Sequence, residues 1–368
     1  MFDWGLVDVS HPLALGARFL AGRPIYRLSI QAYRDMVRDY AAHSRPIQQE
    51  RLWLDRRERA RLVRRLVEHA RPEHRPYRYD PLRRNCVTRI RDVLDEAVAG
   101  RIADQLAVRG HGTLREQILS AVSDWPFIVL GLDIVVNAEV DRPVSLWEEL
   151  FVPEKLREHL RAVSASLDAA APAASLLGEA ERLLAAPERR GPARFGEYLI
   201  VSGLGVLVLA GLAHTRWAPR RLHVRIVGAG IFGFGLLSAL LSTLMAVAWI
   251  VSRLSLLHHN ANLWLFWPVD WVVAVFGLSL MVTGEPWPSD SRRGRWVRRL
   301  VQAHLLGAGV FVILWAGGII QQAVTPVIVG FVPLAGLIYG SAWLALTGVP
   351  SVAGRPFRSH PRNPMAWR

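Results

Sequence analysis

The first half of the chain is organised around one stretch, Tyr77-Arg78-Tyr79-Asp80-Pro81-Leu82-Arg83-Arg84-Asn85-Cys86-Val87-Thr88-Arg89-Ile90-Arg91-Asp92. Its first half predicts an extended piece and a turn, and Asn85 is a favourable N-cap for a helix that runs to about Gly100. Cys86 then lies in the first turn of this helix. It is the only cysteine of the chain, which excludes an intramolecular disulfide and any cysteine-based zinc or iron–sulfur centre.

The expected position of Cys86 gives its thiol two readings. A first helical turn presents unpaired backbone N–H groups and the positive end of the helix dipole, and Arg83, Arg84 and Arg89 add positive charge nearby. These effects predict a lowered thiol pKa and a nucleophile of the kind that works with a histidine base. The alternative is a buried cysteine that packs as a small apolar side chain. The spacing of the residues favours neither reading.

Residues 1–161 have the mixed pattern of an α+β domain, and residues 162–196, rich in Ala, Ser and Leu, predict a helical linker. The helix expected at 55–70 is rich in arginine, but its interspersed acidic residues favour a solvated helix over a nucleic-acid surface. The remaining elements are expected as helices at 13–22, 29–42, 113–123, 126–137 and 153–163 and an extended stretch at Ile47–Leu54.

Long apolar segments dominate the second half, and the mean hydropathy of the chain is +0.20. This pattern excludes an ordinary soluble globular protein. A span needs roughly 20 apolar residues, and five segments approach or exceed that length: 198–215, 226–251, 263–283, 303–320 and 324–346. Residues 197–349 therefore predict an all-α bundle of about five transmembrane helices, followed by a basic tail at 350–368.

The net charge of +14 comes mostly from the apolar half. Residues 197–368 hold 14 arginines and four acidic residues, a net of +10, and 13 of these arginines lie in alternate loops and the tail. Basic loops mark the cytoplasmic side of a membrane protein. The charge therefore indicates topology rather than a nucleic-acid partner, with a cytoplasmic C-terminus and the N-terminal domain outside the cytoplasm.

An exported domain needs a signal peptide, and Met1-Phe2-Asp3-Trp4 does not begin one. Either the N-terminal domain is cytoplasmic, against the arginine count, or the chain begins inside a longer protein. We favour the second expectation.

A second polar cluster begins the third apolar segment. Its members are two histidines, two asparagines and a carboxylate: His258, His259, Asn260, Asn262 and Asp270. Such a group at a membrane face could bind metal, relay protons or hold a polar headgroup. The alternative is an interfacial belt in which neighbouring tryptophans anchor the span and the polar side chains meet water. No metal is assigned, because the spacing matches no known ligand set.

The central stretch resembles the Lnb N-terminal periplasmic domain family, whose pattern is Y-x-Y-D followed by N-C-x-T-R-x-R-D. This chain supplies Tyr77, Tyr79, Asp80, Asn85, Cys86, Thr88, Arg89, Arg91 and Asp92. Similar blocks extend the resemblance over roughly residues 2–160: Phe2-Asp3-Trp4-Gly5-Leu6-Val7-Asp8, Pro72-Glu73-His74-Arg75, Thr113-Leu114-Arg115, Trp125-Pro126, Gly131-Leu132-Asp133, Asp141-Arg142-Pro143 and Phe151-Val152-Pro153.

The resemblance implies a permuted papain-like thiol fold, incomplete at its N-terminus, in a bacterial inner-membrane protein. It implies a lipoprotein N-acyltransferase that carries the acyl chain as a thioester on Cys86, with the other matched residues supporting the site. Membrane lipids and lipoproteins are the implied partners, and no cofactor is implied. The alternatives are an envelope amidase or peptidase and a non-catalytic membrane scaffold.

One part of the family pattern is missing. The family's histidine lies in an F-G-H segment upstream of the first matched block, and this chain starts after it. The histidines noted in the polar half do not match that position: His11, His43, His69, His74 and His111.

Overall fold

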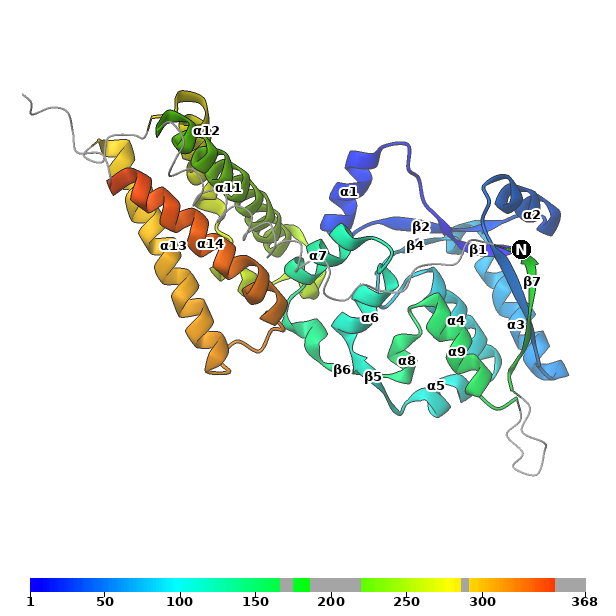
Figure 1. Cartoon of the computed structure of the whole chain (residues 1–368). Helices are drawn as coiled ribbons and strands as arrows, with labels where there is room; N and C mark the ends of the chain where they lie inside the picture. The colour runs from blue at the N-terminus through cyan, green and yellow to red at the C-terminus, as the bar shows by residue number, and fades with distance from the viewer. Residues whose placement is uncertain (166–174, 186–219, 286–290, 348–368) are drawn as a thin grey trace, which may run out of the picture. The chain divides into compact units, whose positions relative to one another are not determined.

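The computed structural model describes residues 1–165, 175–185, 220–285 and 291–347 (Figure 1). Its contacts divide the chain into two compact units. Unit 1 comprises residues 1–197 together with 244–261 and 321–323. Unit 2 comprises residues 198–243, 262–320 and 324–368. Two short segments from the apolar half are therefore part of the N-terminal unit.

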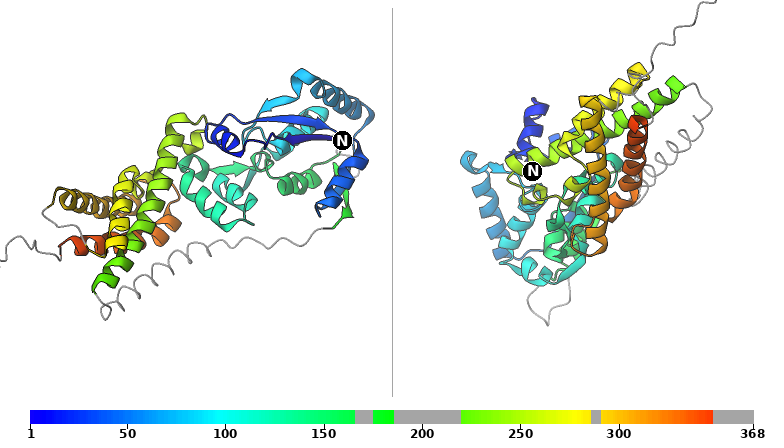
Figure 2. Two further views of the ribbon diagram at one scale, coloured as in Figure 1. Left: turned by 90° about the horizontal axis from the view of Figure 1, so that it is seen from above. Right: turned by 90° about the vertical axis from the view of Figure 1, so that its left-hand side faces the viewer.

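The main sheet of unit 1 is antiparallel, with the strand order β1 (Phe2–Leu6), β2 (Ile25–Ile30) and β4 (Pro76–Arg78) (Figure 2). The Tyr77 hydroxyl on β4 donates a 2.6 Å hydrogen bond to the Trp4 carbonyl on β1 and so ties the two outer strands together. Trp4 and Tyr77 are buried with Val93 of the following helix. The sheet and that helix therefore share one apolar cluster.

Nine α-helices are described in unit 1 up to residue 165, and most lie where the sequence predicts them. They are α1 (Pro12–Leu20), α2 (Tyr33–Ala42), α3 (Arg56–His69), α4 (Cys86–Ala97), α5 (Arg101–Leu106), α6 (Leu114–Ala121), α7 (Pro126–Val135), α8 (Leu146–Glu149) and α9 (Pro153–Ala162). The helix predicted at 29–42 begins only at Tyr33, because Ser29 and Ile30 complete strand β2.

The helical linker expected at 162–196 is wrong at Leu177–Leu184, which form strand β7. This strand pairs antiparallel with β3 (Ile47–Leu52), so two segments about 130 residues apart make one ribbon. Local composition favours a helix there, but β3 needs a partner for its backbone groups. Residues 166–174 and 186–196 of the expected linker lie outside the described residues.

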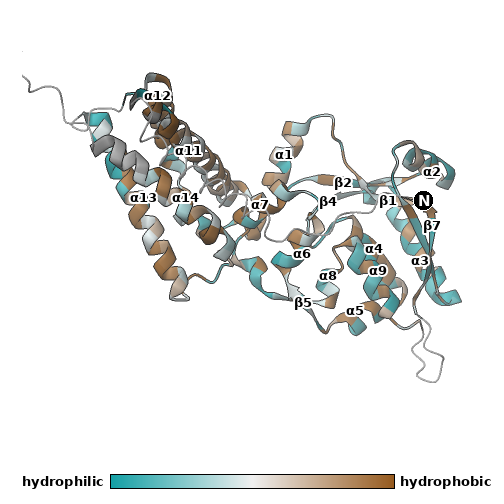
Figure 3. Ribbon diagram, in the orientation of Figure 1, coloured by the Kyte–Doolittle hydropathy of each residue, from teal (hydrophilic) through white to brown (hydrophobic). Residues whose placement is uncertain are grey.

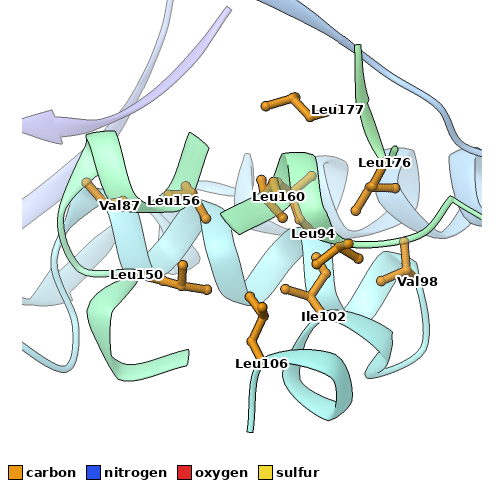
Figure 4. Packing of buried hydrophobic residues seen from close by; sticks show 11 residues of the cluster. Val87, Leu94, Val98, Ile102, Leu106, Leu150, Leu156, Leu160, Leu176 and Leu177 are labelled. Carbon is orange, nitrogen blue, oxygen red and sulfur yellow. The ribbon is translucent and has the colours of Figure 1, made fainter. Parts of the chain in front are cut away.

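The largest apolar cluster of unit 1 packs around α4 and α5 (Figure 4). Leu94 of α4, Ile102 of α5 and Leu160 of α9 are among its buried members. Cys86 packs against the edge of this cluster. The position of the cysteine is thus fixed by helix packing as well as by its place in the chain.

A buried arginine joins three of the sequence blocks noted above. Arg115 of α6 lies 2.8 Å from an oxygen of Asp133 and 2.5 Å from an oxygen of Asp141, and its side chain is 6% exposed. It also donates to the carbonyls of Asp133, Val136 and Asn137. The second oxygen of Asp141 accepts a hydrogen bond from the backbone N–H of Ala323. One guanidinium therefore organises the region between α6 and strand β6 (Pro143–Ser145).

Arg115→Ala should lower the free energy of unfolding by about 3–5 kcal/mol, because it leaves two carboxylates buried beside carbonyls that lose their donor. The matched control is Arg109→Ala on strand β5 (Arg109–Thr113), whose side chain is exposed; it should change stability by no more than about 0.5 kcal/mol. Chemical denaturation followed by tryptophan fluorescence measures both. Equal losses in the two variants would contradict a special role for Arg115.

Unit 2 is built from apolar helices, and Figure 3 shows the many hydrophobic residues along their ribbons. Its elements are most of α11 (Arg220–Val251), the 3₁₀ turns η5 (Ala261–Trp264) and η6 (Pro268–Asp270), and the helices α12 (Trp271–Thr283), α13 (Arg292–Ala316) and α14 (Thr325–Thr347). A Cβ atom at Gly235 would lie 2.8 Å from the Ala274 nitrogen, so α11 and α12 approach closely at small residues.

Two described helices are long and apolar enough to cross a membrane, Val224–Val251 and Arg292–Ala316. A third crossing is possible if Ser255–Trp264 and Pro268–Thr283, bent by 59°, form one broken span. Within α14, the stretch Thr325–Gly340 is apolar. The segment expected to span at 198–215 lies outside the described residues. The structure thus supports a membrane region with two to three of the five expected spans.

Candidate functional site

The Asn85 side chain sets the geometry at the start of α4. Its Oδ1 accepts a 2.8 Å hydrogen bond from the Thr88 N–H, and the Thr88 hydroxyl accepts one of 2.8 Å from the Asn85 N–H. Its Nδ2 donates to the carbonyls of Pro81 and Phe151, both at 2.9 Å. This reciprocal cap confirms the predicted helix start and places Cys86 at its first residue.

The Cys86 thiol lies in a half-buried, largely aromatic environment. It packs against the cluster that contains Trp4 and Tyr77, which also includes Tyr26 and Tyr79. The rings of Tyr26 and Tyr79 stack with their centroids 4.2 Å apart. The surroundings of the sulfur are therefore apolar on the side of the main sheet, as the second reading of Cys86 requires.

Burial raises the pKa of the Cys86 thiol above its ordinary value. The backbone N–H groups of Val87 and Cys86 act in the opposite direction, and the Asp3 carboxylate adds to the increase. The predicted lowering of the pKa is therefore wrong, because desolvation of the thiolate outweighs the helix N-terminus. Two of the arginines that were expected to add positive charge near the thiol contact other groups. Arg83 lies 3.7 Å from Glu139, and the Arg89 guanidinium lies over the Tyr77 ring.

Alkylation of Cys86 at neutral pH should be slower in the folded than in the unfolded chain, and the pH dependence of its rate should be shifted to higher pH. Because the pKa of Cys86 is raised, the folded state holds the thiol proton more tightly than the unfolded chain does. The contribution of this group to folding stability is therefore fully present below the pKa of the unfolded thiol, and it is lost as pH rises through the pKa of the folded one. Iodoacetamide labelling followed by mass spectrometry measures the rate, and the single cysteine makes the label unambiguous. A profile displaced downward would contradict the burial argument.

No histidine among the described residues hydrogen-bonds to the Cys86 thiol. His69 contacts two residues near this site: its ring meets the Trp4 ring edge-on, with centroids 6.0 Å apart, and its Nε2 lies 3.4 Å from an Arg89 nitrogen. Burial, with Arg89 and Arg65, lowers the pKa of His69, which keeps its imidazole neutral. His11, His43, His74 and His111 are exposed.

Other matched residues make local contacts in the turn before α4 and along the helix itself. Asp80 accepts hydrogen bonds from the N–H groups of Leu82 and Arg83 and so closes the turn before Asn85. Arg91 pairs with Asp92 at 2.7 Å and lies over the Trp147 ring at 4.0 Å. These contacts indicate positioning roles in the turn and helix.

The second polar cluster expected from the sequence is divided between the two units. In unit 1, Asn260 donates to the carbonyls of Ile134 and Val135, and the His258 carbonyl accepts from Asn137. His259 lies in the same unit against the Trp249 ring, whereas Asn262 and Asp270 are buried in unit 2.

Asp270 has partners that the sequence analysis missed. Its Oδ1 lies 2.9 Å from His304 of α13, and its Oδ2 accepts from the hydroxyls of Tyr339 on α14, at 3.1 Å, and of Ser238 on α11. All four side chains are buried. The available signal was His304 itself, an ionisable residue inside an apolar segment.

Replacing Asp270 by Leu should lower the unfolding free energy by about 3–5 kcal/mol, because three buried donors lose their common acceptor. Glu285→Gln is the control: its ion pair with Arg221 joins exposed side chains, so the change should stay within about 1 kcal/mol. Thermal unfolding in detergent compares the variants. An Asp270→Leu protein as stable as the control would show that the cluster does not hold the helices together.

Another missed pair is Glu149 and His159, which are buried 2.8 Å apart. Within the described parts of the chain, no group of three or more His, Cys, Asp or Glu side chains is arranged to hold a metal ion.

Comparison with known families matches residues 7–118 to one family, the Lnb N-terminal periplasmic domain. Comparisons with curated proteins and with solved structures gave no significant match. The matched region runs from before α1 into α6 and contains the helix start that bears Cys86. The apolar helices that follow are compatible with a membrane region. Residues 7–118 therefore match the Lnb N-terminal periplasmic domain family, within a chain whose C-terminal apolar helices are compatible with a membrane region.

Proposed function

We propose that this chain is a multi-pass inner-membrane thiol acyltransferase that acts outside the cytoplasm on lipoprotein N-termini or lipids. The observation that carries the proposal is the position of Cys86 at the first residue of α4, inside the matched family region. There the N–H groups of Cys86 and Val87 favour negative charge on the sulfur. A papain-like arrangement of the domain is part of the proposal.

The proposed reaction has two balanced steps. The Cys86 sulfur attacks the carbonyl carbon of an acyl ester, a C–S bond forms, the C–O bond breaks, and the departing alcohol takes the thiol proton. A free amine then attacks the thioester carbonyl, a C–N bond forms, the C–S bond breaks, and an amine proton returns to the thiol. N–H groups at the helix start can stabilise the oxyanion of each tetrahedral intermediate.

The attachment of unit 1 to the end of α11 supports a lipidated substrate. Asn137 donates to the carbonyls of Ser255 and His258, and the Arg253 N–H donates to the Ala21 carbonyl. These contacts hold the domain to residues that follow the Val224–Val251 span directly. An ester anchored in the outer leaflet would lie at the same level of the membrane.

The second candidate function is a non-catalytic membrane scaffold. It is favoured by the raised thiol pKa and by the packing of Cys86 against two apolar clusters. It also fits the lack of a histidine hydrogen bond to the thiol among the described residues. The acyltransferase proposal requires a base that these residues do not place at the sulfur.

Purified protein incubated with a diacylated lipopeptide should form a hydroxylamine-sensitive acyl adduct on Cys86 and an N-acylated product. Cys86→Ala should abolish the adduct and reduce product formation by about 10³-fold or more, because it removes the nucleophile. Intact-mass spectrometry measures both species, and a thermal melt shows whether the variant is folded.

The alternatives give different results in the same assay. Consumption of peptidoglycan fragments or peptides in place of the lipopeptide would identify an amidase or peptidase that uses the same thiol. If the folded protein consumes none of these substrates, the scaffold is the better account. Product formation that survives in Cys86→Ala would exclude the thioester route.

A further inference from the structure

A cleft of about 250 Å³ lies in unit 1 beside the turn that precedes α4. Charged side chains of both signs line it, among them Arg83, Arg91, Arg142, Arg253, Glu139 and Glu148. Cys86 is not among its lining residues, although Asp80 and Arg91 of the matched motif are. The Asn85 side chain connects the cleft with the thiol site, because it donates to the carbonyls of Pro81 and of Phe151, which lines the cleft.

The charges of the cleft are only partly satisfied by one another. Arg142 and Glu148 form a close pair at 2.6 Å. Glu139 has a longer contact of 3.7 Å with Arg83. The guanidinium of Arg253 makes no ion pair or side-chain hydrogen bond with any described residue. One cation and one weakly paired carboxylate therefore remain available to a ligand.

Much of the remaining lining is apolar. Leu114, Val140 and Phe151 belong to a buried cluster, and Leu82 and Leu256 pack against it. All five also line the cleft. A ligand that satisfies the charges would therefore lie against a hydrophobic wall.

The cleft is attached to the end of a membrane span. Four successive lining residues, Arg253 to Leu256, follow Val251, the last residue of α11. The headgroup layer on each side of a bilayer is roughly 5–7 Å thick. Arginine side chains just beyond a span commonly reach the headgroups. The position of Arg253 places the cleft within reach of this layer.

We propose that this cleft binds the headgroup of a zwitterionic phospholipid that carries a primary ammonium and a phosphate. Arg253 contacts the phosphate, Glu139 accepts hydrogen bonds from the ammonium, and the apolar wall receives the first part of an acyl chain. Glu139, whose only ion-pair contact among the described residues is the 3.7 Å one with Arg83, would gain a donor from an ammonium group but not from a purely anionic headgroup. The proposal does not rest on chemistry at Cys86.

The test titrates the detergent-solubilised chain with short-chain phosphatidylethanolamine, phosphatidylcholine and phosphatidylglycerol by calorimetry. Phosphatidylethanolamine should bind about tenfold more tightly than either of the others, because only it supplies both a phosphate and an ammonium with N–H donors. Equal affinity for all three lipids, or preference for phosphatidylglycerol, would overturn the proposal.

Two variants test which residue contacts the phosphate and which contacts the ammonium of the headgroup. Arg253→Ala should weaken phosphatidylethanolamine binding at least tenfold, and Glu139→Gln should remove most of the preference over phosphatidylcholine. Arg34→Ala, an exposed arginine on α2, is the matched control and should bind like the parent protein. Unchanged binding in both cleft variants would overturn the proposal, and a thermal melt confirms that each variant is folded.

Free phosphorylethanolamine distinguishes a lipid from a soluble ligand. Binding of the lipid but not of the free headgroup supports the membrane source, whereas equal binding of both would overturn the role of the apolar wall. Cys86→Ala should bind phosphatidylethanolamine normally. Failure of acyl transfer and failure of lipid binding are therefore separate outcomes.

Discussion

The start of α4 depends on one buried amide. Asn85 is 6% exposed, and its side chain uses its oxygen to cap the helix and its nitrogen to bind the carbonyls of Pro81 and Phe151. A smaller or purely accepting side chain would leave some of these buried groups unpaired, and each unpaired group costs about 1–3 kcal/mol. This amide fixes the first residue of the helix on one side and a wall of the cleft on the other. Both proposed sites depend on it.

Two physical effects compete at Cys86. The helix start stabilises a thiolate, while burial against aromatic rings destabilises it, and burial is the larger effect. A ligand that replaces the missing hydration, or a base that takes the proton during attack, would change this balance. The thiol therefore lies at a helix start, while burial favours its neutral form.

The sequence predicts local features of the fold well because the signals that set them are local. The cap at Asn85, the helix that follows it and the apolar run of α11 each depend on neighbouring residues. Strand β7 could not be predicted in this way, since its partner β3 lies far along the chain. The prediction of a lowered thiol pKa failed for the same reason, because Tyr26 and Trp4 come to lie against Cys86 only when the sheet forms.

The polar sites beyond Cys86 were less predictable. Asp270 was singled out by its charge, but its partners His304 and Tyr339 lie 34 and 69 residues away. The cleft combines residues from the motif, from the region after α7 and from the end of α11. Such combinations are fixed by tertiary packing and leave no fixed spacing in the sequence.

The inclusion of residues 244–261 and 321–323 in unit 1 has a consequence for biosynthesis. The carbonyls of Ile134, Val135 and Val136 accept hydrogen bonds from Asn260 and Gln322, which the ribosome adds more than 120 residues later. The N-terminal domain therefore cannot complete its hydrogen bonding when it first leaves the ribosome. These last hydrogen bonds form only after the intervening apolar helices have been synthesised, so completion of the domain is coupled to synthesis of the second half of the chain.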